Sequence, residues 1–288
     1  MQEALRIASL TSTHKIFLEM DQGDKYSFDL KGSGKGVRVA VIDSGWSVNH
    51  PPPPSLRQGV SFTSRRGGSE SSAALTHDFT GHGTVCSDIL LRVARDALLY
   101  PVKIFEHTIE TGPQRLVAAL EWAIQNEMSV VNLSLSTLRE DAVRYLYTAC
   151  YRAERAGVTL VAANFESSSR SYPCAFDTVI GVQRLSELDH RKIVVKPNHG
   201  IECEVSGTHY SVKGSFGILP CVSSNSCAAP VVTGLVARIK EHQPNATTGQ
   251  VLDILYALAR RHMKTSGLSK VDMQAETESN SGLGLDKN

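Results

Sequence analysis

Three residues whose types could together hydrolyse a peptide bond lie far apart in the chain. Asp43 ends an apolar run, His82 lies between two glycines, and Ser226 precedes the residues Cys-Ala-Ala-Pro. A serine nucleophile needs a base that takes its proton, and the base needs a partner that fixes its tautomer and stabilises its charged form. Each of the three is more often structural when it occurs alone. Their joint occurrence suggests a hydrolase.

The segment around Ser226 predicts a helix that begins near the nucleophile. Asn225 is a residue type that often caps a helix, and Pro230 is expected within the first turn, where a missing N–H costs nothing. The partial positive charge of a helix N-terminus favours a developing oxyanion. This position therefore suits a nucleophilic serine.

Apolar runs typical of buried strands alternate with segments of helical periodicity. The predicted strands cover residues 37–42, 97–105, 129–135, 158–164 and 177–183. The predicted helices cover residues 85–97, 114–128, 139–156, 226–242 and 251–262. This alternation predicts an α/β fold, a three-layer, doubly wound and mostly parallel sheet with helices on both faces. Asp43 would then end a central strand, where such sheets build their sites.

The remaining segments have polar compositions. Residues 1–35 are predicted to be an N-terminal extension, 36–264 one catalytic domain, and 265–288 a disordered tail. The proline-rich stretch 49–72 is predicted to be a surface excursion, and 192–224 to hold short strands and loops.

Composition excludes several classes of protein. Thirty Lys and Arg against 29 Asp and Glu give a net charge of +1, so no nucleic-acid or membrane partner is expected. The six cysteines lack zinc-site spacing, and reduced thiols are predicted. We see no apolar run long enough for a signal peptide or a membrane span, so a cytoplasmic protein is expected, with a secreted mature fragment as the less favoured alternative. The oligomeric state is not indicated.

The residues around the trio resemble the signatures of the subtilisin-like serine proteases, the subtilases. The matching segments are Val-Ile-Asp-Ser-Gly, Gly-His-Gly-Thr and Ser-Asn-Ser-Cys-Ala-Ala-Pro, and the resemblance extends over residues 36–261. It implies a subtilisin-like fold and a serine endopeptidase that works through an acyl-enzyme. By position, Asp43 would orient His82, His82 would be general base and then acid, and Ser226 would be the nucleophile. Asn164 would supply the oxyanion hole together with the backbone N–H of Ser226.

Several positions depart from the family pattern. Ser224 and Asn225 replace the usual Gly-Thr before the nucleophile, Cys227 replaces a Met, and Ala163 replaces the Gly before the oxyanion asparagine. These small changes leave the reaction possible and are expected to affect its efficiency. A cysteine nucleophile at Cys227 is a much less favoured interpretation.

The resemblance also implies which residues contact substrate: Gly112, Arg115, Ser134, Leu135 and Ser136. Ser136 and Thr137 replace two glycines at the rim of the first specificity pocket, so a narrower pocket is predicted. Arg115 replaces a frequent aromatic residue and is predicted to favour an acidic residue upstream of the cut. The other interpretation of Arg115 is a solvated surface charge.

No cofactor is expected. Many subtilases bind calcium through an acidic residue just after His-Pro and through a loop inserted in the helix that follows the catalytic histidine. Here Pro52 follows His50-Pro51, and the helix from Val85 has no such insertion, so too few oxygen ligands converge for a calcium site there.

Three functional interpretations remain to be weighed. Residues 1–35 are too few for a family-type pro-domain, which favours an intracellular protease of narrow specificity that processes a precursor peptide or a partner protein. The alternative is a weak or inactive subtilase fold that binds peptides or acts as a scaffold. Dinucleotide binding by the glycines at 32–36 fails because these glycines precede a strand, whereas a phosphate-binding turn follows one.

Overall fold

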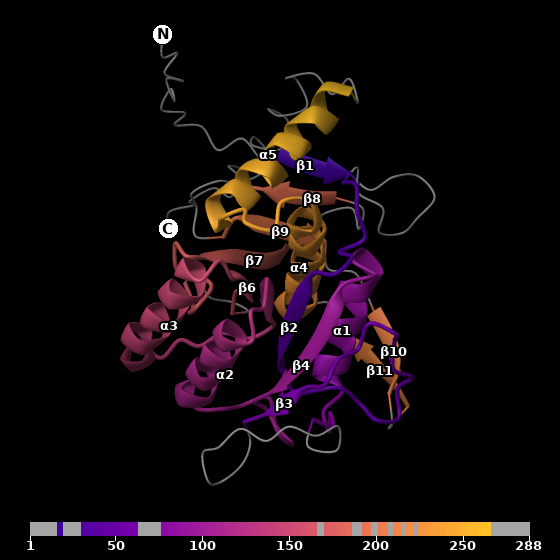
Figure 1. Ribbon diagram of the computed structural model, residues 1–288, viewed down its shortest axis with the longest axis vertical. Coiled ribbons are helices and arrows are strands. Elements are labelled where there is room, and N and C mark those ends of the chain that lie inside the picture. Colours follow the sequence, from indigo (N-terminus) through magenta and orange to yellow (C-terminus); the bar gives the residue numbers. More distant parts are fainter. Residues whose placement is uncertain are drawn as a thin grey trace, which may run out of the picture.

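A mostly parallel sheet runs through the protein (Figure 1). The computed structural model describes residues 16–19, 30–62, 76–165, 170–185, 192–196, 201–206, 210–214, 217–221 and 224–265. Within these residues nine strands pair in the order β1-β8-β9-β7-β6-β5-β2-β4-β3. Neighbours from β9 through β7 to β3 are parallel, while β8 and β1 add an antiparallel edge. The predicted mostly parallel sheet is therefore confirmed.

The strands match the predicted apolar runs closely. Their bounds are β1 Ile16–Glu19, β2 Arg38–Asp43, β3 Val60–Ser61, β4 Leu98–Lys103, β5 Val130–Leu133, β6 Thr159–Ala163, β7 Val179–Leu185, β8 Lys192–Val195 and β9 Cys203–Ser206. A separate antiparallel hairpin joins β10 Tyr210–Gly214 to β11 Gly217–Cys221. Short strands were expected after residue 192, whereas β1 was not predicted.

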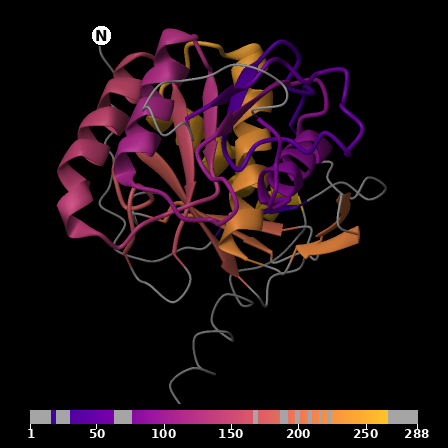
Figure 2. The same cartoon turned by 90° about the horizontal axis from the view of Figure 1, so that it is seen from below.

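Helices cover both faces of the sheet. They are α1 His82–Val93, α2 Pro113–Gln125, α3 Val143–Arg155, α4 Asn225–His242 and α5 Thr248–Thr265, with a 3-10 turn, η1, at Glu140–Ala142. Figure 2 shows α2 and α3 on one side of the sheet and α1 and α4 on the other. The three predicted layers are present.

Strand β2 shows why its sequence lacks polar alternation. Val39 and Val41 pack in the core on the α1 and α4 side, while Ala40 and Ile42 pack in the core on the α2 and α3 side. Because both faces of β2 are buried, every position between Arg38 and Asp43 is apolar.

The predicted start of α1 is wrong by three residues. Apolar periodicity begins at Val85, but the helix begins at His82 and ends at Val93, before the predicted end at residue 97. Gly81 is the N-cap in a left-handed conformation with φ 81°, so the polar residues at 82–84 form the first turn. His82 thus lies on a helix instead of in a turn.

The chain order places the site at a switch in the sheet. From β2 the chain passes through α1 to β4 on one side, and then through α2 to β5 on the other side of β2. Open α/β sheets bind ligands outside the carboxyl ends of strands at such a switch. The carboxyl ends of β2, β5 and β6 lie side by side there.

Other predictions concern the ends and loops of the chain. The glycine loop at 32–36 donates the N–H groups of Ser33, Gly34 and Lys35 to one carboxylate oxygen of Glu241, at 2.7, 2.8 and 3.1 Å. This loop therefore holds an anion of the protein itself, consistent with the rejection of a dinucleotide site. The predicted tail at 265–288, apart from Thr265 at the end of α5, and residues 63–72 of the predicted excursion at 49–72 lie outside the described residues. Among the helices that are described, none has the length and apolar character needed to cross a membrane.

Candidate active site

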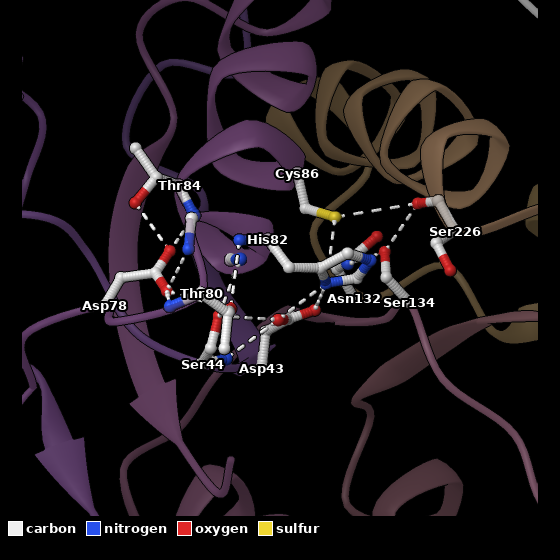
Figure 3. Close-up of polar contacts among 12 residues, drawn as sticks. Asp43, Ser44, Asp78, Thr80, His82, Thr84, Cys86, Asn132, Ser134 and Ser226 are labelled. Atoms are coloured by element: carbon white, nitrogen blue, oxygen red, sulfur yellow. Dashed lines mark hydrogen bonds and ion pairs between the residues drawn. The ribbon is translucent and has the colours of Figure 1, made fainter. Parts of the chain in front are cut away.

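Asp43 and His82 form a close pair. Asp43 is the last residue of β2 and is fully buried, while His82 is the first residue of α1 and is half-buried. Nδ1 of His82 lies 2.8 Å from Oδ1 and 2.9 Å from Oδ2 of Asp43 (Figure 3). With Nδ1–H donated to the carboxylate, Nε2 keeps a lone pair and can accept a proton.

A second set of hydrogen bonds fixes the carboxylate of Asp43 in place. Its Oδ1 accepts the backbone N–H of Ser44 at 2.8 Å and the hydroxyl of Ser44 at 3.1 Å. The same hydroxyl oxygen accepts the N–H of Gly83 at 2.8 Å, so it ties β2 to α1. A Cβ at Gly83 would lie 2.6 Å from the carbonyl oxygen of Gly45, which explains the glycine after His82.

Asp78 caps the helix that carries His82. Its Oδ1 accepts the N–H groups of Thr80 and Gly81 at 3.0 and 2.7 Å, and its Oδ2 accepts the N–H and hydroxyl of Thr84 at 2.9 and 2.7 Å. A carboxylate suits the N-terminal N–H groups of a helix. The sequence analysis missed this residue, although an aspartate a few residues before a helix start is a usable signal.

The pKa of His82 is raised well above its ordinary value. Burial lowers this pKa, but the charge of Asp43, the nearby Cys86 and the hydrogen bond to Asp43 together outweigh burial. A more basic imidazole accepts a proton from a hydroxyl more readily.

Ser226 lies close to this pair. It is the second residue of α4, half-buried, as the sequence predicted for a helix start. The sulfur of Cys86 lies 3.9 Å from Nδ1 of His82 and 3.6 Å from the carbonyl oxygen of Ser226, so it connects the two. Among the residues drawn in Figure 3, no hydrogen bond joins His82 to the Ser226 hydroxyl. Such bonds are often loose without substrate.

The backbone of Ser226 is held by a relay of side chains. Pro230 lies inside α4 and has no backbone N–H. In a regular helix the N–H at this position would donate to the carbonyl four residues earlier, which is that of Ser226. The Ser134 hydroxyl donates to the Ser226 carbonyl at 2.8 Å instead. Nδ2 of Asn132 donates to the Ser134 hydroxyl at 2.9 Å, and the Thr233 hydroxyl donates to Oδ1 of Asn132 at 2.9 Å. The expectation that Pro230 lies in the first turn is wrong, because the helix begins at Asn225.

Asn164 follows β6 and is almost fully buried. Its N–H donates to the carbonyl of Val182 at 2.7 Å, and its own carbonyl accepts Nδ2 of Asn225 at 3.0 Å. Asn225 directly precedes Ser226, so its side chain links the backbone of Asn164 to the start of α4. This corrects the predicted N-cap: Ser224 has that position, and its side chain makes no capping bond.

Comparison with known proteins agrees with this geometry. Residues 34–284 match the subtilase family over most of the chain. The chain belongs to the subtilase family. A thermostable alkaline protease of Halalkalibacterium halodurans is 30% identical over 233 residues, 76% of this chain and 60% of that protein. Subtilisin BL of Lederbergia lenta is 29% identical over 248 residues, 82% of this chain and 85% of that protein.

Solved structures support the fold of this subtilase. A cold adapted subtilisin-like serine proteinase has a TM-score of 0.65 at 20% identity, over 80% of this chain and 85% of that chain. Sphericase has a TM-score of 0.66 at 22% identity, over 78% of this chain and 84% of that chain. The three-layer fold is thus that of subtilisin-like proteins.

The predicted substrate residues of this subtilase lie on two elements. Ser134, Leu135 and Ser136 directly follow β5, and Ser134 is buried with its hydroxyl on Ser226. Gly112 is the N-cap of α2, and Arg115 is half-buried in the first turn of that helix. Ser134 is hydrogen-bonded to the nucleophile residue, through the backbone carbonyl of Ser226.

One group of side chains could hold a metal ion. Ligand atoms of Asp43, His82 and Cys86 lie within 4.8 Å of one another, which among the described residues is the one such group. Thiolate and imidazole suit soft metals better than calcium. These are the atoms that the proton transfer needs, so a metal there would compete with it.

The cysteines correct one prediction. Cys86, Cys150, Cys174 and Cys203 are free and buried, as expected for reduced thiols. Cys227, in contrast, is disulfide-bonded. A sulfur in a disulfide has no thiolate to attack a substrate, which counts against Cys227 as a nucleophile.

Proposed function

We propose that this subtilase is a serine endopeptidase that cleaves peptide bonds through an acyl-enzyme. The observation that carries the proposal is the Asp43–His82 pair, which lies beside Ser226 at the start of α4. The proteases named above, which match most of this chain, support the same reaction.

The proposed reaction moves one proton between Ser226, His82 and the leaving amine. Oγ of Ser226 attacks the substrate carbonyl carbon and gives its proton to Nε2 of His82, while Asp43 stabilises the imidazolium. The oxyanion forms near the N-terminus of α4, where the N–H of Ser226 and the amide of Asn164 would donate to it. His82 then protonates the leaving amine, and a water molecule, activated in the same way, releases the acyl group from Ser226.

A fluorophosphonate probe tests this proposal. It reacts with an activated serine, so the wild-type chain should be labelled and should hydrolyse casein, while Ser226→Ala should do neither. A chain that binds casein peptides but is not labelled would support the alternative, a peptide-binding subtilase fold without catalysis. Ser136→Ala serves as a matched serine variant and should still be labelled.

Narrow specificity is the finer part of the proposal. Ser136 and Thr137 are half-buried after β5, where side chains would narrow a pocket, and Arg115 offers a positive charge at the start of α2. Cleavage of a peptide library should then favour acidic residues upstream of the cut, and Arg115→Ala should remove this preference without changing kcat. Broad cleavage by both chains would contradict it. Comparing new N-termini in native host cells that carry wild type or Ser226→Ala would identify the natural substrate.

Two further predictions concern the setting of this reaction. No calcium is expected to bind beside His50, so a chelator should leave the melting temperature unchanged.

The disulfide at Cys227 is a feature of oxidising compartments, so it argues against the expected cytoplasmic location. Cell fractionation decides between an oxidising compartment and the cytoplasm.

A further inference from the structure

The hydroxyl of Ser171 lies next to the side chain of Asn164. Ser171 is fully buried, and its hydroxyl donates to Oδ1 of Asn164 at 2.7 Å. The hydroxyl oxygen of Ser171 also accepts the backbone N–H of Phe165 at 2.9 Å. Both bonds are within the usual range for strong hydrogen bonds.

These two bonds together fix the direction of the Asn164 amide. A backbone N–H can only donate, so it occupies one of the two lone pairs of the Ser171 oxygen, and the hydroxyl proton stays available for donation. That proton is donated to Asn164, which places the carbonyl end of the amide against Ser171 and turns its NH₂ group to the other side. An amide rotated by half a turn would present its carbonyl oxygen, which repels an oxyanion, where a donor is needed.

The rest of Asn164 is already held. Its N–H bonds to Val182 and its carbonyl to Asn225, so the backbone is fixed on both sides. The main freedom left is rotation of the side chain, and Ser171 restricts that rotation.

Ser171 itself is held by the chain around it. Its neighbour Tyr172 pairs with Thr137 through two backbone bonds, from the N–H of Thr137 at 2.7 Å and from the N–H of Tyr172 at 2.9 Å. Thr137 belongs to the segment after β5 that also carries Ser134. The hydroxyl of Ser171 is therefore presented to Asn164 from a fixed backbone.

We propose that Ser171 is a positioning residue that orients the amide of Asn164 so that its NH₂ group, not its carbonyl oxygen, faces the oxyanion. This inference rests on the proposed serine endopeptidase function. Ser171 itself would not touch the substrate, so its effect should be on kcat and not on KM.

A double-mutant cycle tests the proposal. The substrate is a quenched peptide built from a casein site that the wild-type chain cleaves, and kcat and KM are measured for wild type, Ser171→Ala, Asn164→Ala and the double variant. Loss of one neutral hydrogen bond predicts a drop of about tenfold in kcat for Ser171→Ala, with KM within about twofold. In the Asn164→Ala background the same change should alter kcat by less than about twofold, because no amide remains to be oriented.

Two controls separate orientation from loss of folding. Ser87→Ala removes another fully buried hydroxyl, one without a hydrogen-bond partner in the described part of the chain, and should leave kcat unchanged. Ser171→Thr keeps the hydroxyl and should recover most of the activity lost in Ser171→Ala. The acid limb of the pH profile should be the same in Ser171→Ala as in wild type, because His82 is not altered.

The outcomes are distinguishable. An equal loss of kcat in both backgrounds, or a loss in KM alone, overturns the role of Ser171 and leaves the proposed function intact. A wild-type chain that neither hydrolyses casein nor reacts with the fluorophosphonate overturns both proposals.

Discussion

At the scale of single residues, the chemistry depends on the charge state of His82. Asp43 holds the pKa of this imidazole well above its ordinary value despite burial, and only the neutral form can take a proton from Ser226. The kcat/KM of the wild-type chain should therefore rise with pH along an acid limb whose midpoint lies clearly above about 6.5. A midpoint below this value would contradict the electrostatic effect of Asp43.

The variant Asp43→Asn isolates that effect. Removing the carboxylate charge removes the main influence that raises the pKa of His82, so the acid limb should move to lower pH. The rate should fall by about 10,000-fold, as it does in other triads that lose the aspartate, because the tautomer is no longer fixed. Because hydrolysis will be slow, the labelling rate with a fluorophosphonate is the better measurement.

Cys86 gives a second prediction at this scale. Its sulfur contacts both His82 and the backbone of Ser226, within a group that could bind a soft metal. Stoichiometric mercuric chloride should therefore abolish hydrolysis, and Cys86→Ala should remove this sensitivity, whatever its own rate. Cys150→Ala removes another buried thiol, on α3, and should remain sensitive. Inhibition that persists in Cys86→Ala would place the mercury elsewhere.

Much of the site could be predicted at residue scale, and the reason is physical. Hydrolysis demands an acid, a base and a hydroxyl, and Asp43, His82 and Ser226 have these types in local contexts that the sequence displays. Ser171 and Asn225 were not predicted in their observed roles, because each role is a contact with a segment distant in sequence. Nothing near Ser171 in the chain indicates that its hydroxyl meets Asn164.

At the scale of elements, Pro230 and Ser134 together determine which group donates to the carbonyl of Ser226. The proline removes the N–H that would bond the carbonyl of Ser226, and the Ser134 hydroxyl replaces it. Ser134→Ala should therefore lower the free energy of unfolding by about 1 to 3 kcal/mol, the cost of a buried carbonyl that loses its main donor. In the Pro230→Ala background this loss should be smaller, because a helical N–H becomes available.

Urea unfolding measures this coupling, with all variants made in Ser226→Ala to prevent self-cleavage. Ser136→Ala, two residues further along the same segment, provides the control. An equal loss in the two backgrounds would show that Ser134 acts independently of Pro230.

The elements also show where periodicity misleads. The apolar pattern of α1 begins three residues after the helix does, because the first turn is polar and is held by the Asp78 cap. The four residues of β1 have no distinctive sequence pattern, and this strand is defined by its pairing with β8.

At the scale of the molecule, Glu241 joins the last turn of α4 to the loop that precedes β2. Its carboxylate, at the end of α4, accepts three N–H groups of the loop before β2. Burial raises the pKa of Glu241, but the three hydrogen bonds and the nearby His242 outweigh this, so its pKa lies below the ordinary value. A lowered pKa stabilises the fold above the unfolded pKa of about 4.3, and this stability is lost as the pH falls through the folded pKa.

The variant Glu241→Gln tests this link. It should be less stable than wild type at pH 7, by about 1 to 2 kcal/mol, and the difference should shrink in acid. Urea unfolding at neutral and acidic pH, again in Ser226→Ala, gives the comparison. Glu110→Gln changes an exposed carboxylate and should have no such effect.

The separation of the three catalytic candidates along the chain has a consequence in time. Asp43 ends β2, His82 begins α1, and Ser226 comes only with α4, so no short fragment holds all three. A ribosome must therefore synthesise α4 and release it from the exit tunnel before the base and the nucleophile can meet. Until then the nascent protease cannot cut itself or the chains being made beside it.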